Sequence, residues 1–177
     1  MKKISSIVLV LIMFITSCSS DDNETQVFEN IIGTWIGTEI TLQGEVKTEV
    51  NGQTILSTIT GDGYDLNNEL LFAKSPNTVT SEGNLNMKIT YTINGVELTE
   101  DVENFEFLGD GIWEINGSEL IITDPTLDVE DDDIRLVNIL KLTETELIIK
   151  MTETVEEIEG GETITGVTEI VASFVKE

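Results

Sequence analysis

The pair Asn94-Gly95 divides a stretch of alternating apolar and polar residues, and this stretch constrains the fold more than any other. Alternation with a period of two predicts β-strands with one apolar face, because successive side chains point to opposite faces of a strand. Asn-Gly is a strong signal for a two-residue hairpin, since both turn positions need a positive φ. The predicted cross-strand pairs are Ile93 with Val96, Tyr91 with Leu98 and Met87 with Val102. The apolar faces of the two strands then coincide, which fixes their register.

Four further turn signals give hairpins with matching apolar faces. They are Asn51-Gly52, Asn116-Gly117, residues 143–146 and Gly160-Gly161. The pairs that they predict include Trp113 with Leu120, Leu140 with Ile149, Leu142 with Leu147, and Met151 with Ile170. The side chains predicted to point inward are those of Ile40, Leu42, Ile55, Met87, Tyr91, Leu98, Trp113, Leu120, Leu140, Ile149, Met151 and Ile170.

The hairpins predict an all-β fold of about eight to ten antiparallel strands in sequence-neighbour order. An up-and-down β-barrel is the economical architecture, because closure removes both open edges of the sheet. A two-sheet β-sandwich is the alternative. Trp35 lies off the face defined by Ile36, Ile40 and Leu42, and a β-bulge at Gly37 would turn its side chain inward.

The N-terminus has the pattern of an export signal. Lys2 and Lys3 precede an apolar run at residues 7–15, which has the length of a signal-peptide core and is too short to span a bilayer. A small residue, Ser17, then stands directly before Cys18, and this arrangement resembles the lipobox of bacterial lipoproteins. The resemblance implies that residues 1–17 are a cleaved signal peptide. It also implies that Cys18 is lipidated and attaches the mature chain to a membrane.

Residues 18–29 are predicted to be the lipidated cysteine followed by a flexible acidic tether, and residues 30–177 to be the barrel domain. The run Ser19-Ser20-Asp21-Asp22 resembles the surface-export signal of lipoproteins from the Bacteroidota. It implies an outer-membrane protein exposed on the cell surface. A periplasm-facing lipoprotein with an acidic spacer is the alternative.

Composition excludes several classes of function. With 34 acidic against 9 basic residues the net charge is −25, which repels nucleic acid. The chain has no histidine and one cysteine, so catalytic sites that require imidazole, common zinc sites and an internal disulfide are excluded. No spacing of carboxylates selects a glycosidase pair. We therefore expect a protein that is not an enzyme and has no cofactor. We also expect a monomer.

Acidic residues are dense in one predicted loop, which contains Asp128, Glu130, Asp131, Asp132 and Asp133. Calcium needs six to eight oxygen ligands in a shaped loop, and this cluster lacks the spacing and the glycine of an EF-hand. The loop is therefore interpreted as a solvated acidic surface, and its acids are weak candidates for a metal site.

Gly33-Thr34-Trp35, at the start of the first predicted strand, resembles the Gly-x-Trp signature of lipocalins. The order of the later motifs, from Leu71-Phe72 through residues 111–122 to residues 139–149, is similar to lipocalin-like domain lipoproteins of the Bacteroidota. The resemblance covers roughly residues 30–175 and implies a barrel used for binding. The chain lacks the disulfide cysteines and the later Thr-Asp-Tyr motif of true lipocalins.

Two functional hypotheses follow. In the first, the barrel binds a small apolar or glycan-like ligand, and Trp35, Tyr91 and Trp113 line the site. In the second, the protein has a structural or protein-interaction role in the cell envelope, with a solid barrel core and no small-molecule ligand. An eight-stranded barrel is compatible with both, because its interior is just wide enough to be filled by side chains or to hold one small ligand.

Overall fold

The computed structural model describes residues 29–50, 52–125, 134–159 and 162–177. Within these ranges the chain forms one sheet of 11 strands. They are β1 (Gly33–Val50), β2 (Gln53–Tyr64), β3 (Glu69–Phe72), β4 (Thr78–Glu82), β5 (Asn86–Ile93), β6 (Val96–Val102), β7 (Gly111–Asn116), β8 (Glu119–Thr123), β9 (Ile134–Leu142), β10 (Glu146–Glu159) and β11 (Glu162–Lys176). The structure does not describe the predicted signal peptide, Cys18, tether residues 19–28, the loop acids from Asp128 to Asp133, or the turn residues Asn51, Gly160 and Gly161. Glu29, predicted to end the tether, is instead helical and forms an ion pair with Lys74.

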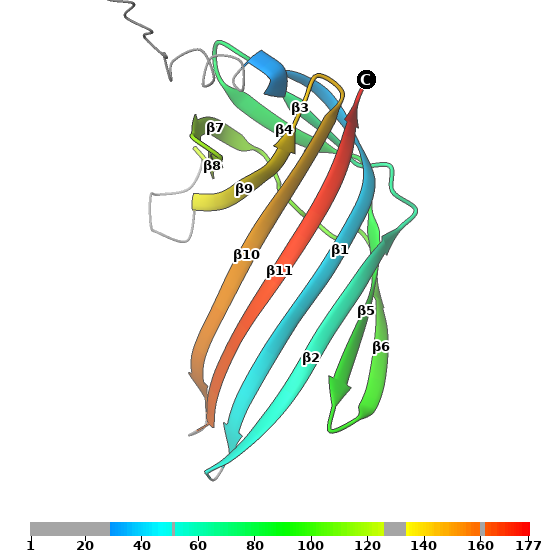
Figure 1. The fold of residues 1–177 in the computed structure, drawn as a ribbon, viewed down its shortest axis with the longest axis vertical. Helices are drawn as coiled ribbons and strands as arrows, with labels where there is room; N and C mark the ends of the chain where they lie inside the picture. The colour runs from blue at the N-terminus through cyan, green and yellow to red at the C-terminus, as the bar shows by residue number, and fades with distance from the viewer. Residues whose placement is uncertain (1–28, 51, 126–133, 160–161) are drawn as a thin grey trace, which may run out of the picture.

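Strands β1, β3, β4, β7, β8, β9, β10 and β11 close into a barrel in that order (Figure 1). The ring is completed by antiparallel pairing of β11 with β1, which runs from Trp35 to Glu49. The prediction of an all-β antiparallel barrel is therefore confirmed, in preference to the sandwich. Closure pairs the edges that an open sheet would expose.

Strand β1 belongs to two parts of the sheet. Its first residues, Gly33 to Ile36, pair with β3, and the segment from Thr41 to Val50 pairs with β2. Strands β2, β5 and β6 then extend the sheet outside the ring. The predicted sequence-neighbour order therefore fails between β2 and β3, between β4 and β5, and between β6 and β7. Strand β3 returns to the start of β1, β5 pairs with β2, and β4 pairs with β7.

A β-bulge places Trp35 inside the barrel, as the sequence predicted. The pairing of β1 with β11 shifts register between Gly37 and Glu39, so the inward parity changes from odd to even residues. Trp35 and Ile40 are consequently both buried. The bulge reconciles the tryptophan with the face formed by Ile40 and Leu42.

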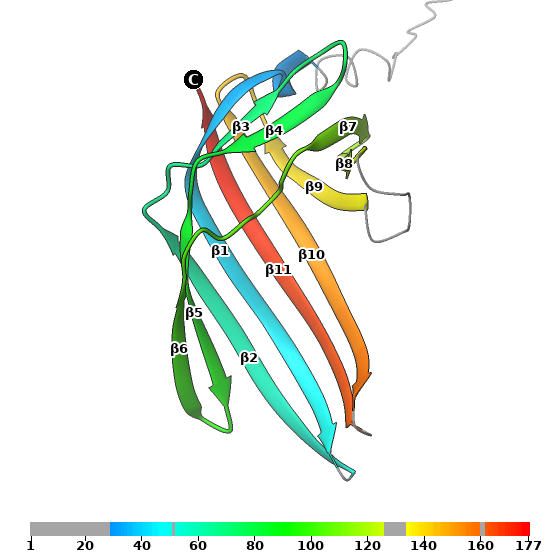
Figure 2. The same ribbon diagram turned by 180° about the vertical axis from the view of Figure 1, so that it is seen from behind.

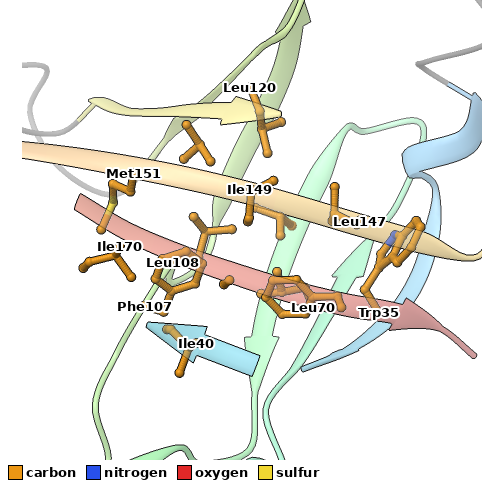
Figure 3. Close-up of a cluster of buried hydrophobic side chains, with 14 of the residues drawn as sticks. Trp35, Ile40, Leu70, Phe107, Leu108, Leu120, Leu147, Ile149, Met151 and Ile170 are labelled. Atoms are coloured by element: carbon orange, nitrogen blue, oxygen red, sulfur yellow. The ribbon is translucent and has the colours of Figure 1, made fainter. Parts of the chain in front are cut away.

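The barrel interior is filled by one cluster of apolar side chains, part of which is shown in Figure 3. Its largest fully buried members come from β1, β3, β5, β7, β8, β10 and β11, from the segment between β6 and β7, and from Ile31 before β1. In Figure 3, Phe107 and Leu108 of that segment lie near Ile40 of β1 and Ile170 of β11. The described residues contain no helix long and apolar enough to cross a membrane.

The hairpin of β7 and β8 has a different register from the predicted one. Trp113 lies opposite Ile122, and Leu120 lies opposite Ile115. The turn is centred on Gly117 and Ser118, with Gly117 at φ 62°, rather than on Asn116 and Gly117. A displacement by two residues preserves the faces, so Trp113 and Leu120 are still buried.

The prediction that Leu140 faces inward opposite Ile149 is wrong. A register shift in the pairing of β9 with β10 places Ile139 opposite Ile149, and Leu140 is 55% exposed. The pair Leu142 and Leu147 has the predicted register. The bulge lies between the Leu142–Leu147 pair and the Ile139–Ile149 pair. It reverses which residues of β9 face inward on the N-terminal side of the bulge.

Leu98 has the predicted partner, Tyr91, but is 58% exposed. The hairpin of β5 and β6 has the predicted type I′ signature, with Asn94 at φ 51° and Gly95 at φ 78°. It lies outside the ring, however, where the apolar face is not covered by an opposing strand. Tyr91 and Ile55 are half-buried for the same reason.

Candidate functional site

Trp35 closes one end of the barrel, here called the closed end, together with the helical residues 29–31. The Trp35 Nε1 donates to the Ile31 carbonyl oxygen at 2.7 Å, and the side chain is 0% exposed. Lys176 Nζ lies 5.0 Å from the centroid of the Trp35 ring and donates to the Asn30 carbonyl oxygen at 2.8 Å. These contacts attach the start of the domain to the end of β11, and they make Trp35 part of the core.

Trp113 lies in the same core, in contact with β3. Its Nε1 donates to the Ala73 carbonyl oxygen at 3.1 Å, and its ring meets Phe72 edge to face with the centroids 6.0 Å apart. Only 1% of Trp113 is exposed. Tyr91 lies outside the ring on β5, so the structure does not bring the three predicted binding residues together.

The opposite end of the barrel, here called the mouth, is crossed by residues 103–110. Figure 2 shows this segment passing from β6 to β7 across β1 and β11. Phe107 stacks on Phe174 of β11 with the ring centroids 6.5 Å apart, and Leu108 is buried in the core. The amide of Phe105 donates to the Leu85 carbonyl oxygen at 2.8 Å. Phe107 and Leu108 therefore pack this segment against the core, and the hydrogen bond of Phe105 attaches it to Leu85.

A cavity of about 610 Å³ lies between the crossing segment and strands β1, β9, β10 and β11. Its apolar wall comes from Leu42, Phe105, Phe107, Leu108, Met151 and Ile170, whereas Ile134 and Leu136 of β9 border it with exposed side chains. Glu153, Thr152 and Thr168 add polar groups to its lining. We call this the apolar cavity.

A second cavity of about 440 Å³ lies on the other side of the crossing segment, against β3, β4 and residues 83–85. Its lining is rich in amides and carboxylates and includes Asn68, Asn84, Asn104, Glu106, Asp110 and Asp124. Asp110 Oδ1 accepts a hydrogen bond from the Ser81 amide at 2.8 Å, which links the crossing segment to β4. We call this the polar cavity. Neither cavity is lined by Trp35, Tyr91 or Trp113.

Arg135 is shared by the two cavities, together with Phe105, Glu106 and Phe107. It pairs with Ile122, a buried inward residue, so the alternation of β9 directs the Arg135 side chain toward the barrel interior at the mouth. A Cβ at Gly109 would lie 2.9 Å from Glu106 Oε1 and 3.3 Å from Arg135 Nη2. Glycine at this position, with φ 65°, therefore leaves room for both charged groups.

Two buried polar atoms at the mouth have no hydrogen-bond partner within the described structure: Arg135 Nη1 and Asn68 Oδ1. Asn68 is only 8% exposed, and its backbone carbonyl accepts from the Gly37 amide at 2.9 Å. A buried polar group without a partner is costly, and such groups occur at sites that bind a ligand or water.

Arg135, Asn68 and Glu106 were not predicted as site residues from the sequence. The available signal was that Arg135 is the single arginine in a chain of net charge −25, but the predicted register with Leu140 inward turned its side chain outward. Asn68 carried no such signal, because it lies in a Gly- and Asn-rich stretch typical of a turn.

Two titratable groups on the extended sheet have shifted pKa values. Loss of solvation, reinforced by the charge of Asp101, raises the pKa of Tyr64, whose hydroxyl lies 3.4 Å from Asp101 Oδ1. Hydrogen bonds from Lys150 and Gln43 lower the pKa of Glu169. Neither Tyr64 nor Glu169 lines the mouth cavities, so both shifts reflect local pairing on the sheet.

No group of three or more metal-ligating side chains occurs among residues 29–50, 52–125, 134–159 and 162–177. The weak metal candidates from Asp128 to Asp133 fall in the gap between these ranges. Comparisons with protein-family models, with curated proteins and with solved structures found no match to this chain.

Proposed function

We propose that this protein is a lipid-anchored envelope protein whose barrel binds a small, largely apolar ligand at its mouth and does not transform it. The apolar cavity carries this proposal. Its volume of about 610 Å³ falls within the range of small-molecule sites, and its lining combines apolar side chains such as Leu42, Met151 and Ile170 with polar groups. Arg135, Glu106 and Glu153 supply those polar groups.

The apolar cavity is not lined by Trp35 or Trp113, which the sequence predicted to contact the ligand. Trp35 and Trp113 are buried in the filled interior, whereas Leu42, Met151 and Ile170 line space at the mouth. An eight-stranded barrel that is filled for most of its length can hold one small ligand at an open end. The proposed ligand site is therefore the mouth rather than the neighbourhood of the tryptophans.

The first test uses the neutral fluorescent probe N-phenyl-1-naphthylamine. Thr168 is half-buried and lines the apolar cavity, so Thr168→Trp should fill part of that space. We expect the variant to bind the probe about tenfold more weakly, equivalent to about 1.4 kcal/mol.

Thr54→Trp is the matched control, because Thr54 is exposed on β2 and lines neither mouth cavity. It should bind the probe as the native protein does. Equal affinity in both variants, or no binding by the native protein, would contradict a ligand site at the mouth.

A second candidate function is a structural or protein-interaction role without a small ligand. The filled interior around Trp35 and Trp113 favours it. The exposed apolar side chains of Val96 and Leu98, on a hairpin outside the ring, also favour it. Native mass spectrometry of protein purified from its own cells separates the two functions, since only the binding function predicts a co-purifying small molecule.

The location that we propose is the outer surface of the outer membrane. It is supported by Cys18 and the adjoining run Ser19-Ser20-Asp21-Asp22. Protease treatment of intact cells should remove the domain, while a periplasmic marker protein stays intact. If the domain survives this treatment and is digested only after lysis, it faces the periplasm and the acidic run is a spacer.

A further inference from the structure

Building on the function proposed above, we propose that the polar cavity binds hydroxyl groups of a saccharide-like head, so that the ligand is an alkyl or acyl saccharide. The apolar cavity would receive the chain of such a molecule and the polar cavity its head. The two cavities share Phe105, Glu106, Phe107 and Arg135, so one molecule can contact both.

The chemistry of the head follows from the two atoms without a partner. Arg135 Nη1 can only donate a hydrogen bond, whereas Asn68 Oδ1 can only accept one. A carboxylate or phosphate dianion offers acceptors alone, and an ammonium group offers donors alone. A hydroxyl group donates and accepts, and a molecule with several hydroxyls can satisfy both protein atoms.

Electrostatics also disfavours an anionic head. Glu106, Asp110 and Asp124 line the polar cavity around the one cation, Arg135, among the residues that form its wall. The chain as a whole carries a net charge of −25, so the potential around the cavity is negative. Bringing an anion into this field is unfavourable, because like charges repel more strongly where water is partly excluded. A neutral head that donates to carboxylates and accepts from Arg135 fits the same wall without that repulsion.

The remaining lining is consistent with such a head. Asn84 and Asn104 add amide side chains to the wall, and each of these side chains carries both donors and an acceptor. The cavity volume of about 440 Å³ lies within the range of small-molecule sites. Asn68 is almost fully buried, and its position over Gly37 is restricted, since a Cβ at Gly37 would lie 2.2 Å from Asn68 Oδ1.

The test compares three probes with the same alkyl chain, each below its micelle concentration: n-octyl-β-D-glucoside, n-octanol and sodium octanoate. Affinities are measured by isothermal titration calorimetry with the whole domain. We expect the glucoside to bind at least about tenfold more tightly than octanol, which corresponds to about 1.4 kcal/mol. Octanoate should bind more weakly than the glucoside.

Asn68→Leu removes the unpartnered acceptor at similar volume, and Arg135→Met removes the unpartnered donor while keeping an apolar stem. Each should reduce the ratio of glucoside to octanol affinity about tenfold. Lys141→Met is the control, because it removes one cation from the same strand at an exposed position that lines neither cavity. Its ratio should equal that of the native protein. Two variants at separate positions keep the test informative if one of them does not fold.

Each of the following results rejects a stated part of the proposal. If octanol and the glucoside bind equally, the polar cavity holds only water, and the saccharide head is rejected while the apolar site stands. If octanoate binds most tightly, the head is an anion and the inference is wrong. If none of the three probes binds, the proposed function fails and the saccharide head fails with it.

Discussion

Replacing Cys18 with alanine is expected to transfer the protein from the membrane fraction to the soluble fraction. A buried acyl chain contributes about 0.8 kcal/mol per methylene group, and stable anchoring takes at least two such signals. The bacterial lipoprotein motif that Cys18 resembles implies this kind of anchor. The measurement is the distribution of the protein between pellet and supernatant after a carbonate wash.

Ser19→Ala is the control for this experiment, since it changes the next residue and leaves the thiol in place. It should sediment with membranes as the native chain does. If the Cys18→Ala protein also stays in the pellet, the anchor lies elsewhere in the chain, and the interpretation of residues 1–17 as a lipoprotein signal is wrong.

The faces of the strands could be predicted from sequence because alternation and hairpin turns are local. Pairing about Asn94-Gly95 has the predicted register, and the bulge that buries Trp35 was indicated by the conflict between its position and Ile40. Both inferences need only the spacing of apolar residues and the requirement for one buried face.

The positions that failed depend on information from other strands. Leu140 faces solvent because of a bulge against β10, and no residue near it signals that bulge. Leu98 is exposed because β5 and β6 extend outside the ring, a consequence of β3 returning to β1. Local alternation specifies which residues share a face, but not whether another element covers that face.

The candidate site was harder to predict than the fold because it depends on contacts between segments that are distant in the chain. Residues 103–110 have no strand periodicity, yet they cross the mouth and separate its two cavities. Arg135 and Asn68 are 67 residues apart in the chain and line the same cavity only after the barrel has closed. Aromatic residues were the stronger sequence signal, but burying their large surfaces stabilises the core, and that is where Trp35 and Trp113 lie.

Replacing Trp113 with alanine is expected to lower the free energy of unfolding by about 3–5 kcal/mol, the usual cost of truncating a buried Trp or Phe. The substitution removes the contact with Phe72 and the hydrogen bond to the Ala73 carbonyl oxygen. A domain of ordinary stability has about 5–15 kcal/mol in total, so the loss is a large part of it. Urea unfolding should show a lower midpoint with an unchanged slope.

Trp113→Phe provides the matched comparison, because it keeps an aromatic ring against Phe72 and loses the indole nitrogen that bonds to Ala73. It should destabilise the domain less than the alanine variant. Because Trp113 lines neither mouth cavity, the phenylalanine variant should bind N-phenyl-1-naphthylamine with native affinity. Lost probe binding with native stability would instead make Trp113 a ligand contact, as the sequence first suggested, and would place the site inside the barrel rather than at its mouth.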